Sequence, residues 1–278
     1  MIILAPTDFS RLSKVAILYA VQMAIKMKAE LMIIHIVFGQ ASVRAMMVSP
    51  KLEEEMKQIA REDMENLVAE IKKEVKGRLT ITTHIILGFP VSEMILGFMK
   101  KIKVDCVVTA TQGATGLKKV LIGTNAAALM EDASAPVILV PRNSSYKALR
   151  RVVYASDLLH LDQELSILRD FIKPYNAAIE VVHVLPEEAE DSIDAGDIRK
   201  DLIQKMNYQK INFTLIHNDD ITGALDNFMI DSKGDMLVMF THKPGFFEKL
   251  FSRSVTRKIA FHSSIPMLTF NRKMLDVH

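Results

Sequence analysis

The first half of the chain alternates short apolar runs with segments that have helix-start signals or helical hydrophobic spacing. The predicted strands are residues 2–5, 30–37, 81–87, 105–110 and 136–140, and the predicted helices begin at Ser10, Pro50, Pro90 and Gly123. Strands that are apolar throughout and separated by helices are typical of a parallel sheet that is covered on both faces. The pattern therefore predicts an α/β fold with a doubly wound, five-stranded parallel sheet.

The second half repeats the order of the first. Asp8 matches Asp157 at an offset of 149, and His35 matches His183 at an offset of 148. The pairs that share a later offset of 130 are Ile81 and Ile211, Thr111 and Thr241, Lys119 and Lys249, and Pro136 and Pro266. A constant offset over about sixty residues predicts two copies of one domain. The fall from 148 to 130 removes 18 residues between the second and third strands of the second copy, which predicts a shorter second helix there.

Length agrees with this division, because 278 residues fit two domains of roughly 140 residues each. We expect the first domain to span residues 1–143 and the second to span residues 148–274. The polar stretch at residues 143–146 is the expected linker.

Composition narrows the class of protein. Hydrophobic residues make up 49% of the chain and charged residues 24%, as in ordinary globular proteins. The net charge of +2 is too small to indicate a nucleic-acid or anionic-membrane partner. The sequence has no signal-peptide pattern and no apolar run long enough to span a membrane. Cys106 is the only cysteine, so an internal disulfide is impossible and a cytoplasmic location is expected.

The loop after the fourth strand carries the strongest candidate chemistry. It lies at the carboxyl end of a strand, where open α/β sheets bind ligands. Gly113 and Gly116 permit close backbone approach, and Gly123-Thr124 opens a helix whose free N–H groups suit a phosphate. The alternative is a loop with glycines at its turns and Thr124 as a simple N-cap.

At this loop the chain resembles a tandem universal stress protein. ATP-binding members of that family carry Gly-x-x-Gly, nine residues, and then Gly-Ser/Thr. Gly113, the nine residues 114–122 and Gly123-Thr124 match this motif, whereas Ala110 replaces its first glycine. The similarity spans both halves of the chain, and residues 6–10 also resemble the first loop of the family.

The resemblance implies an adenine nucleotide, ATP or AMP with or without Mg²⁺, in the first domain. Asp8 and Ile36 would contact the adenine or ribose, and Thr7 would line the pocket; Asp8 also has a simpler interpretation as an acidic residue at a helix N-terminus. The expected nucleotide-binding residues are Pro6, Thr7, Asp8, Ile36, Ala110, Gly113, Gly123, Thr124 and Asn125. The two domains would pair about a pseudo-two-fold axis through residues 137–140 and 267–270, and a homodimer stays open.

The second copy departs from the motif. Phe240, Lys243, Phe246 and Arg253 stand where the first copy has Ala110, Gly113, Gly116 and Gly123. Large side chains at these positions predict that the same nucleotide pose is blocked. Lys243 and Arg253 are interpreted as a solvated basic edge of a degenerate domain, with a tethered-cation site for another anion as the alternative.

The remaining candidates favour structural roles. His35 and His183 lie inside apolar strands without metal-ligand spacing, so no metal site is expected. Cys106 is expected to be an inert core thiol, and residues 51–76 a solvated helix with i,i+4 pairs.

No catalytic motif is present, and we expect no catalytic residue. The sequence therefore predicts a stress-response protein that binds an adenine nucleotide in its N-terminal domain as a sensor or regulator, with a structural C-terminal domain. An interaction module that binds no nucleotide and a slow ATP hydrolase are the alternatives.

Overall fold

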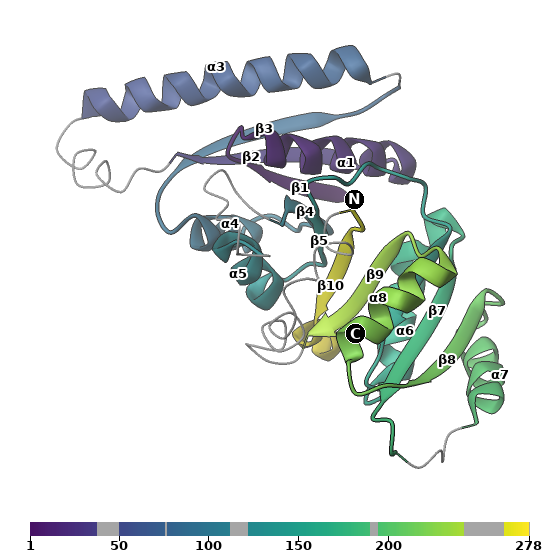
Figure 1. Cartoon of the computed structure of the whole chain (residues 1–278). Helices are drawn as coiled ribbons and strands as arrows, with labels where there is room; N and C mark the ends of the chain where they lie inside the picture. Colours follow the sequence, from purple (N-terminus) through teal and green to yellow (C-terminus); the bar gives the residue numbers. More distant parts are fainter. Residues whose placement is uncertain (38–49, 76, 112–121, 190–193, 242–263, 278) are drawn as a thin grey trace. The chain divides into compact units, whose positions relative to one another are not determined.

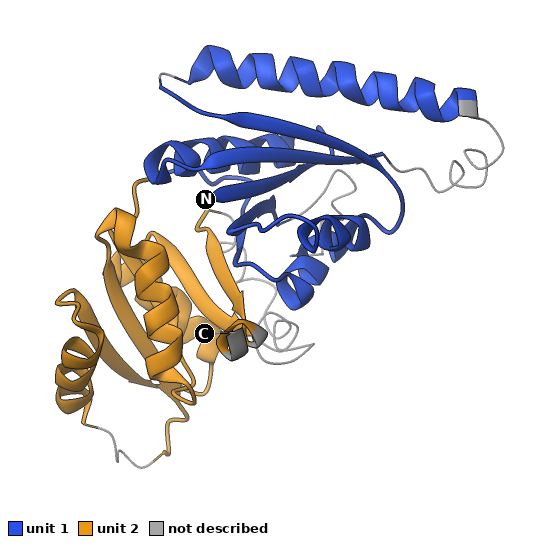
Figure 2. Cartoon of the chain, turned by 180° about the vertical axis from the view of Figure 1, so that it is seen from behind, with its two compact units in different colours: residues 1–146 blue, residues 147–278 orange. Residues whose placement is uncertain are grey.

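A computed structural model describes the chain except for residues 38–49, 76, 112–121, 190–193, 242–263 and 278. The chain divides into two compact units, Met1–Tyr146 and Lys147–His278, which Figure 2 colours separately. Each unit is an α/β structure built around five parallel strands.

Unit 1 contains a parallel sheet with the strand order β3-β2-β1-β4-β5 (Figure 1). Its strands are β1 (Ile2–Thr7), β2 (Glu30–Val37), β3 (Ile81–Leu87), β4 (Cys106–Ala110) and β5 (Val137–Val140). The register aligns Ile3 of β1 with Leu31 of β2 and with Cys106 of β4. These central strands are almost wholly buried, which explains why they appear in the sequence as continuous apolar runs.

Within the part of unit 1 that the structure describes, four helices cover this sheet. They are α1 (Arg11–Met27), α3 (Pro50–Glu74), α4 (Val91–Met99) and α5 (Thr124–Asp132). Right-handed crossovers place α1 and α3 on one face and α4 and α5 on the other, and α3 packs on β2 and β3. The predicted start of α1 is confirmed, because the Ser10 side chain accepts a hydrogen bond from the Ser13 N–H as an N-cap.

Unit 2 has the corresponding strand order, β8-β7-β6-β9-β10. Its strands are β6 (Arg151–Ala155), β7 (Ala178–Leu185), β8 (Ile211–His217), β9 (Met236–Thr241) and β10 (Met267–Asn271). Its helices are α6 (Leu161–Ile172), α7 (Ala195–Met206) and α8 (Ile221–Ser232), with short 3-10 turns η1 (Lys173–Tyr175) and η2 (Arg272–Val277).

The predicted fold class is therefore confirmed for both units. The second helix of unit 2, α7, has 12 residues where α3 of unit 1 has 25, as the missing 18 residues predicted. The pairing of the two domains about a pseudo-two-fold axis stays a prediction. Within the described residues, no helix has the length and apolar character that crossing a membrane would require.

Candidate functional site

Unit 1 contains a cavity of about 550 Å³ at the carboxyl ends of β1, β2 and β4. The strand order of the sheet reverses between β1 and β4, and open α/β sheets form their ligand crevice at such a switch point. Helices α3, α4 and α5 contribute the remaining walls, and the lining is mainly apolar. The cavity is thus where fold geometry favours a ligand.

The cavity brings together eight of the nine residues expected to bind nucleotide. They are Pro6, Thr7, Asp8, Ile36, Ala110, Gly123, Thr124 and Asn125. Gly113 lies outside the described residues, as does Gly116. The described candidates come from three separate strands and one helix start, and the fold places them around one space.

The loop between β1 and α1 is held by its own side chains. The Phe9 N–H donates to Thr7 Oγ1 at 3.0 Å, and the Ser10 N–H donates to Asp8 Oδ1 at 3.0 Å. Phe9 has a φ of 58°, which a phenylalanine rarely adopts outside such a tight turn. The Asp8 carboxylate thus supports the start of α1, and Asp8 also lines the cavity, where its contact with a ligand stays a prediction.

His35 joins the ends of β1 and β2. Its Nδ1 lies 2.8 Å from the Thr7 carbonyl oxygen, and its ring packs against Phe9 with 4.4 Å between centroids. A carbonyl oxygen can only accept, so Nδ1 carries the hydrogen and Nε2 of the neutral ring is an acceptor. Burial lowers the pKa of His35, while the bond to Thr7 and the carboxylates of Asp8 and Asp63 raise it. The expected structural role fits these contacts, and His35 also lines the cavity.

The start of α5 forms the opposite wall. Gly123 is the N-cap, with φ −69° and ψ 155°, and offers no side-chain acceptor to the first turn. The interpretation of Thr124 as the N-cap is wrong, because Thr124 is the first helical residue. The first turn contains no acidic residue, so its positive dipole end is not neutralised from within the helix. This end of the cavity can accept an anion.

Helix α3 supplies cavity residues that sequence reasoning missed. Met56, Ile59, Ala60 and Asp63 all line the cavity. The expected i,i+4 pairing is present elsewhere on this helix, where Lys57 contacts Glu53. The helical spacing of the four lining residues could have indicated one shared face of the helix, but the charges between them favoured a solvated helix.

Unit 2 contains a loop with the same local bonds at the end of β6. The Leu158 N–H donates to Ser156 Oγ at 3.1 Å, and the Leu159 N–H donates to Asp157 Oδ1 at 3.0 Å. His183 Nδ1 lies 2.8 Å from the Ser156 carbonyl oxygen, and Leu158 has a φ of 66°. The geometry of the β1–α1 loop thus recurs where the offset of 149 placed it.

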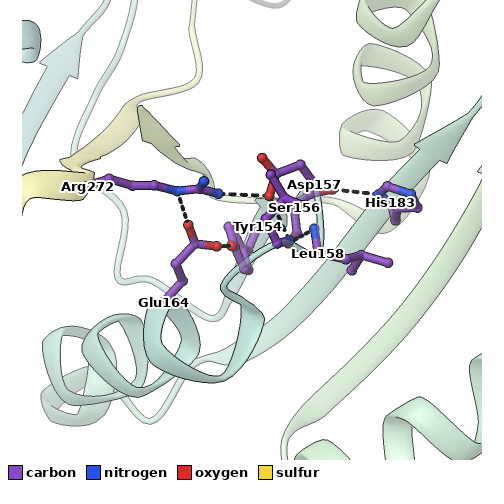
Figure 3. A network of polar contacts seen from close by, with 8 residues as sticks. Tyr154, Ser156, Asp157, Leu158, Glu164, His183 and Arg272 are labelled. Carbon is purple, nitrogen blue, oxygen red and sulfur yellow. Dashed lines mark hydrogen bonds and ion pairs between the residues drawn. The ribbon is translucent and has the colours of Figure 1, made fainter. Parts of the chain in front are cut away.

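Unit 2 also contains a polar network around Asp157 (Figure 3). Arg272 donates from Nη2 to Asp157 Oδ1 at 2.8 Å and from Nε to Glu164 Oε1 at 2.5 Å. Glu164 is fully buried on α6, and the Tyr154 hydroxyl donates to its other oxygen. Asp157, the counterpart of Asp8, is therefore already bound by a guanidinium of its own chain.

Aromatic packing fills the same part of unit 2. The offset of 130 aligns Phe240 with Ala110 of unit 1. Phe240 is buried and stacks on Phe270 with 4.6 Å between ring centroids. Tyr154 meets the Phe240 ring edge-on. This agrees with the expected obstruction by Phe240. The other expected obstructions, Lys243, Phe246 and Arg253, lie outside the described residues.

Cys106 has the surroundings of a structural residue. Cys106 is fully buried in β4, and burial raises the pKa of its thiol, which favours the inert neutral form. Among the described residues, no group of three or more His, Cys, Asp or Glu side chains is placed to hold a metal ion.

Comparisons with known proteins agree with the fold. A structure of a universal stress protein from Archaeoglobus fulgidus superposes with a TM-score of 0.72 at 16% identity and covers 98% of both chains. A functionally unknown protein from Pseudomonas aeruginosa gives a TM-score of 0.63 at 12% identity, covering 99% of this chain and 94% of its own. At these identities the likeness concerns the fold alone.

Sequence comparisons cover about half of the chain. A universal stress protein from Methanocaldococcus jannaschii is 29% identical over 141 residues, which are 50% of this chain and 81% of the relative. A second one from the same organism is 25% identical over 158 residues, covering 51% and 96%. The sequence profile of the universal stress protein family matches residues 1–141. The chain therefore belongs to the universal stress protein family.

Proposed function

We propose that unit 1 binds one adenine nucleotide, ATP or AMP, and that this binding makes the protein a sensor or regulator in a stress response. The observation that carries the proposal is the gathering of Asp8, Ile36 and the start of α5 around one cavity. These groups are far apart in the sequence, and the family resemblance assigns them to opposite ends of one ligand.

The cavity suits such a ligand in size and polarity. Its volume of about 550 Å³ lies within the range of roughly 300–1,000 Å³ that is usual for small-molecule sites. A phosphate at the first turn of α5 would meet N–H groups without an intrahelical acceptor and the positive end of the helix dipole. Apolar side chains of α3 and α4 would cover the base. Ala110 adds one methyl group beside the phosphate path, which a small shift of the ligand accommodates.

We propose further that the chain carries two universal stress protein domains, residues 1–143 and 148–274, of which the second is structural. The corresponding strand orders and the recurring loop bonds at Thr7 and Ser156 support this duplication. Arg272 on Asp157 and the buried Phe240 support the loss of nucleotide binding from unit 2.

Calorimetric titration of ATP and AMP tests the proposed site. We expect one site per chain, and we expect Gly123→Arg to abolish it by filling the phosphate end of the cavity. Gly97→Arg is the matched control, because a side chain at Gly97 meets open space and Gly97 lies outside the cavity lining. Absence of heat and of any thermal shift at millimolar nucleotide would contradict the proposal. Steady phosphate release that is lost with Asp8→Ala would instead indicate a hydrolase.

A further inference from the structure

The cavity of unit 1 has two chemically different ends. The start of α5 follows β4 and can hold an anion, whereas α3 packs over β2 and β3 on the other side of β1. Two strand spacings separate β4 from β2, which is about 10 Å. A nucleotide with its phosphates at α5 must therefore extend its base toward β2 and α3.

Among the described residues, unit 2 has no counterpart of the wall at α3. Subtracting the offset of 130 from Ala195, where α7 begins, gives position 65. Residues 50–64 of α3 thus have no helical counterpart in α7, and all four cavity-lining residues of α3 fall within that stretch. The additional turns that distinguish unit 1 from unit 2 are the turns that reach the cavity.

Apolar packing fixes these turns against the sheet. Ala60 is buried against Val37 at the end of β2, and Met56, Ile85 and Leu87 pack around this pair. Asp63 lies three residues after Ala60 and therefore on the same face of the helix. Its carboxylate is exposed at the cavity mouth, so a ligand can reach it.

The polar groups that surround this end include three acceptors. Asp63 and Asp8 carry carboxylates, and the contact of Nδ1 with the Thr7 carbonyl leaves His35 with Nε2 as an acceptor. Asp63, Asp8 and His35 all line the same cavity. The thioether, sec-butyl and methyl side chains of Met56, Ile59 and Ala60 provide no strong donor. A base that presents hydrogen-bond donors is thus favoured here, and one that presents a carbonyl oxygen is opposed.

We propose that Asp63 is a specificity-determining residue, whose carboxylate accepts a hydrogen bond from the exocyclic amine of a bound amino-purine. This inference rests on the proposed nucleotide site and names the residue that reads the base. The N–H of the amine donates to Asp63, whereas the carbonyl oxygen of an oxo-purine at the same position meets the negative charge.

Titration of ATP and of inosine triphosphate tests the inference, because the two ligands differ at the position of the exocyclic amine. For the wild-type chain we expect ATP to bind at least tenfold more tightly, as one hydrogen bond to a charged group provides. Asp63→Asn should weaken ATP binding and bring the two affinities within about threefold, since an amide side chain can both donate and accept. Glu65→Gln removes a neighbouring exposed carboxylate outside the cavity lining and should keep the wild-type ratio.

The outcomes separate this inference from the proposed function. Equal binding of the two nucleotides by the wild-type chain, or an unchanged ratio in Asp63→Asn, overturns the role of Asp63 and leaves the nucleotide site intact. Failure of both nucleotides to bind overturns the proposed function and the inference together. Thermal unfolding of each variant verifies that the exposed substitutions leave the fold unchanged.

Discussion

The Nε of Arg272 lies 2.5 Å from Oε1 of Glu164, although 108 positions separate the two residues in the sequence. Glu164 is fully buried, and Arg272 is 11% exposed. A buried carboxylate without a cation is strongly unfavourable, so this pair ties the end of β10 to α6. The same guanidinium also donates to Asp157. Asp157 is the unit 2 counterpart of Asp8, which lines the cavity of unit 1.

We expect Arg272→Met to destabilise the protein by about 3–5 kcal/mol, because it leaves the Glu164 charge buried without its partner. Chemical denaturation monitored by circular dichroism measures this loss. Lys200→Met is the matched control: Lys200 is 78% exposed and its partner Asp197 is 74% exposed, so no measurable loss of stability is expected.

A second variant tests the cause of this loss. Adding Glu164→Gln to Arg272→Met removes the uncompensated charge and should restore more than half of the lost stability. A double variant that is as unstable as Arg272→Met would show that packing around Arg272, and not the buried charge, accounts for the effect.

His35 predicts a pH dependence of stability. Its folded-state pKa is lowered chiefly by burial, so the unfolded chain binds the proton first as the pH falls below 6.5. Stability should therefore decrease between pH 6.5 and the lower folded-state pKa, with no contribution from His35 at higher pH. In His35→Gln this part of the decrease should vanish. Parallel stability curves for the two proteins from pH 7.5 to 5 would refute the assignment.

For Asp226 on α8 we expect stability to depend on pH in the opposite direction. Burial, with a smaller contribution from Asp220, raises its pKa from 3.8 to about 6. The folded state thus retains a proton that the unfolded state has lost, and stability falls as the pH rises from 3.8 through about 6. Asp226→Asn should stabilise the protein at pH 8 by roughly 1–3 kcal/mol and have little effect near pH 4.

The matched control for this prediction is Asp231→Asn, which removes an exposed carboxylate from the same helix. Denaturation midpoints at pH 4, 6 and 8 for both variants provide the comparison. A stabilisation by Asp226→Asn that is the same at all three pH values would point to helix propensity and not to proton linkage.

Much of the fold could be predicted from local sequence patterns. The central strands of unit 1, β1, β2 and β4, are largely buried, so their apolar runs are continuous and are flanked by recognisable helix starts such as Ser10. The shorter helix α7 followed from the change of offset. Most residues of the candidate site were found because a glycine-containing loop and an Asp-containing loop follow strand ends, where this fold class places ligands.

The rest depends on tertiary contacts that no local pattern encodes. Asp63 lies in helix α3, whose many charged residues indicate a solvent-exposed helix. Asp63 lines the cavity only because α3 packs over β2. Arg272 follows the last strand of unit 2, and its partners Asp157 and Glu164 precede it by 115 and 108 residues. Without an observed sheet order, the sequence gives no reason to connect these three residues.

Native mass spectrometry of the full chain with ATP counts the nucleotides bound to each molecule. We expect one bound nucleotide per chain, present in the wild type and in Gly97→Arg and absent from Gly123→Arg. A chain that binds no nucleotide, or one that binds two with Arg272 in place, would contradict this expectation.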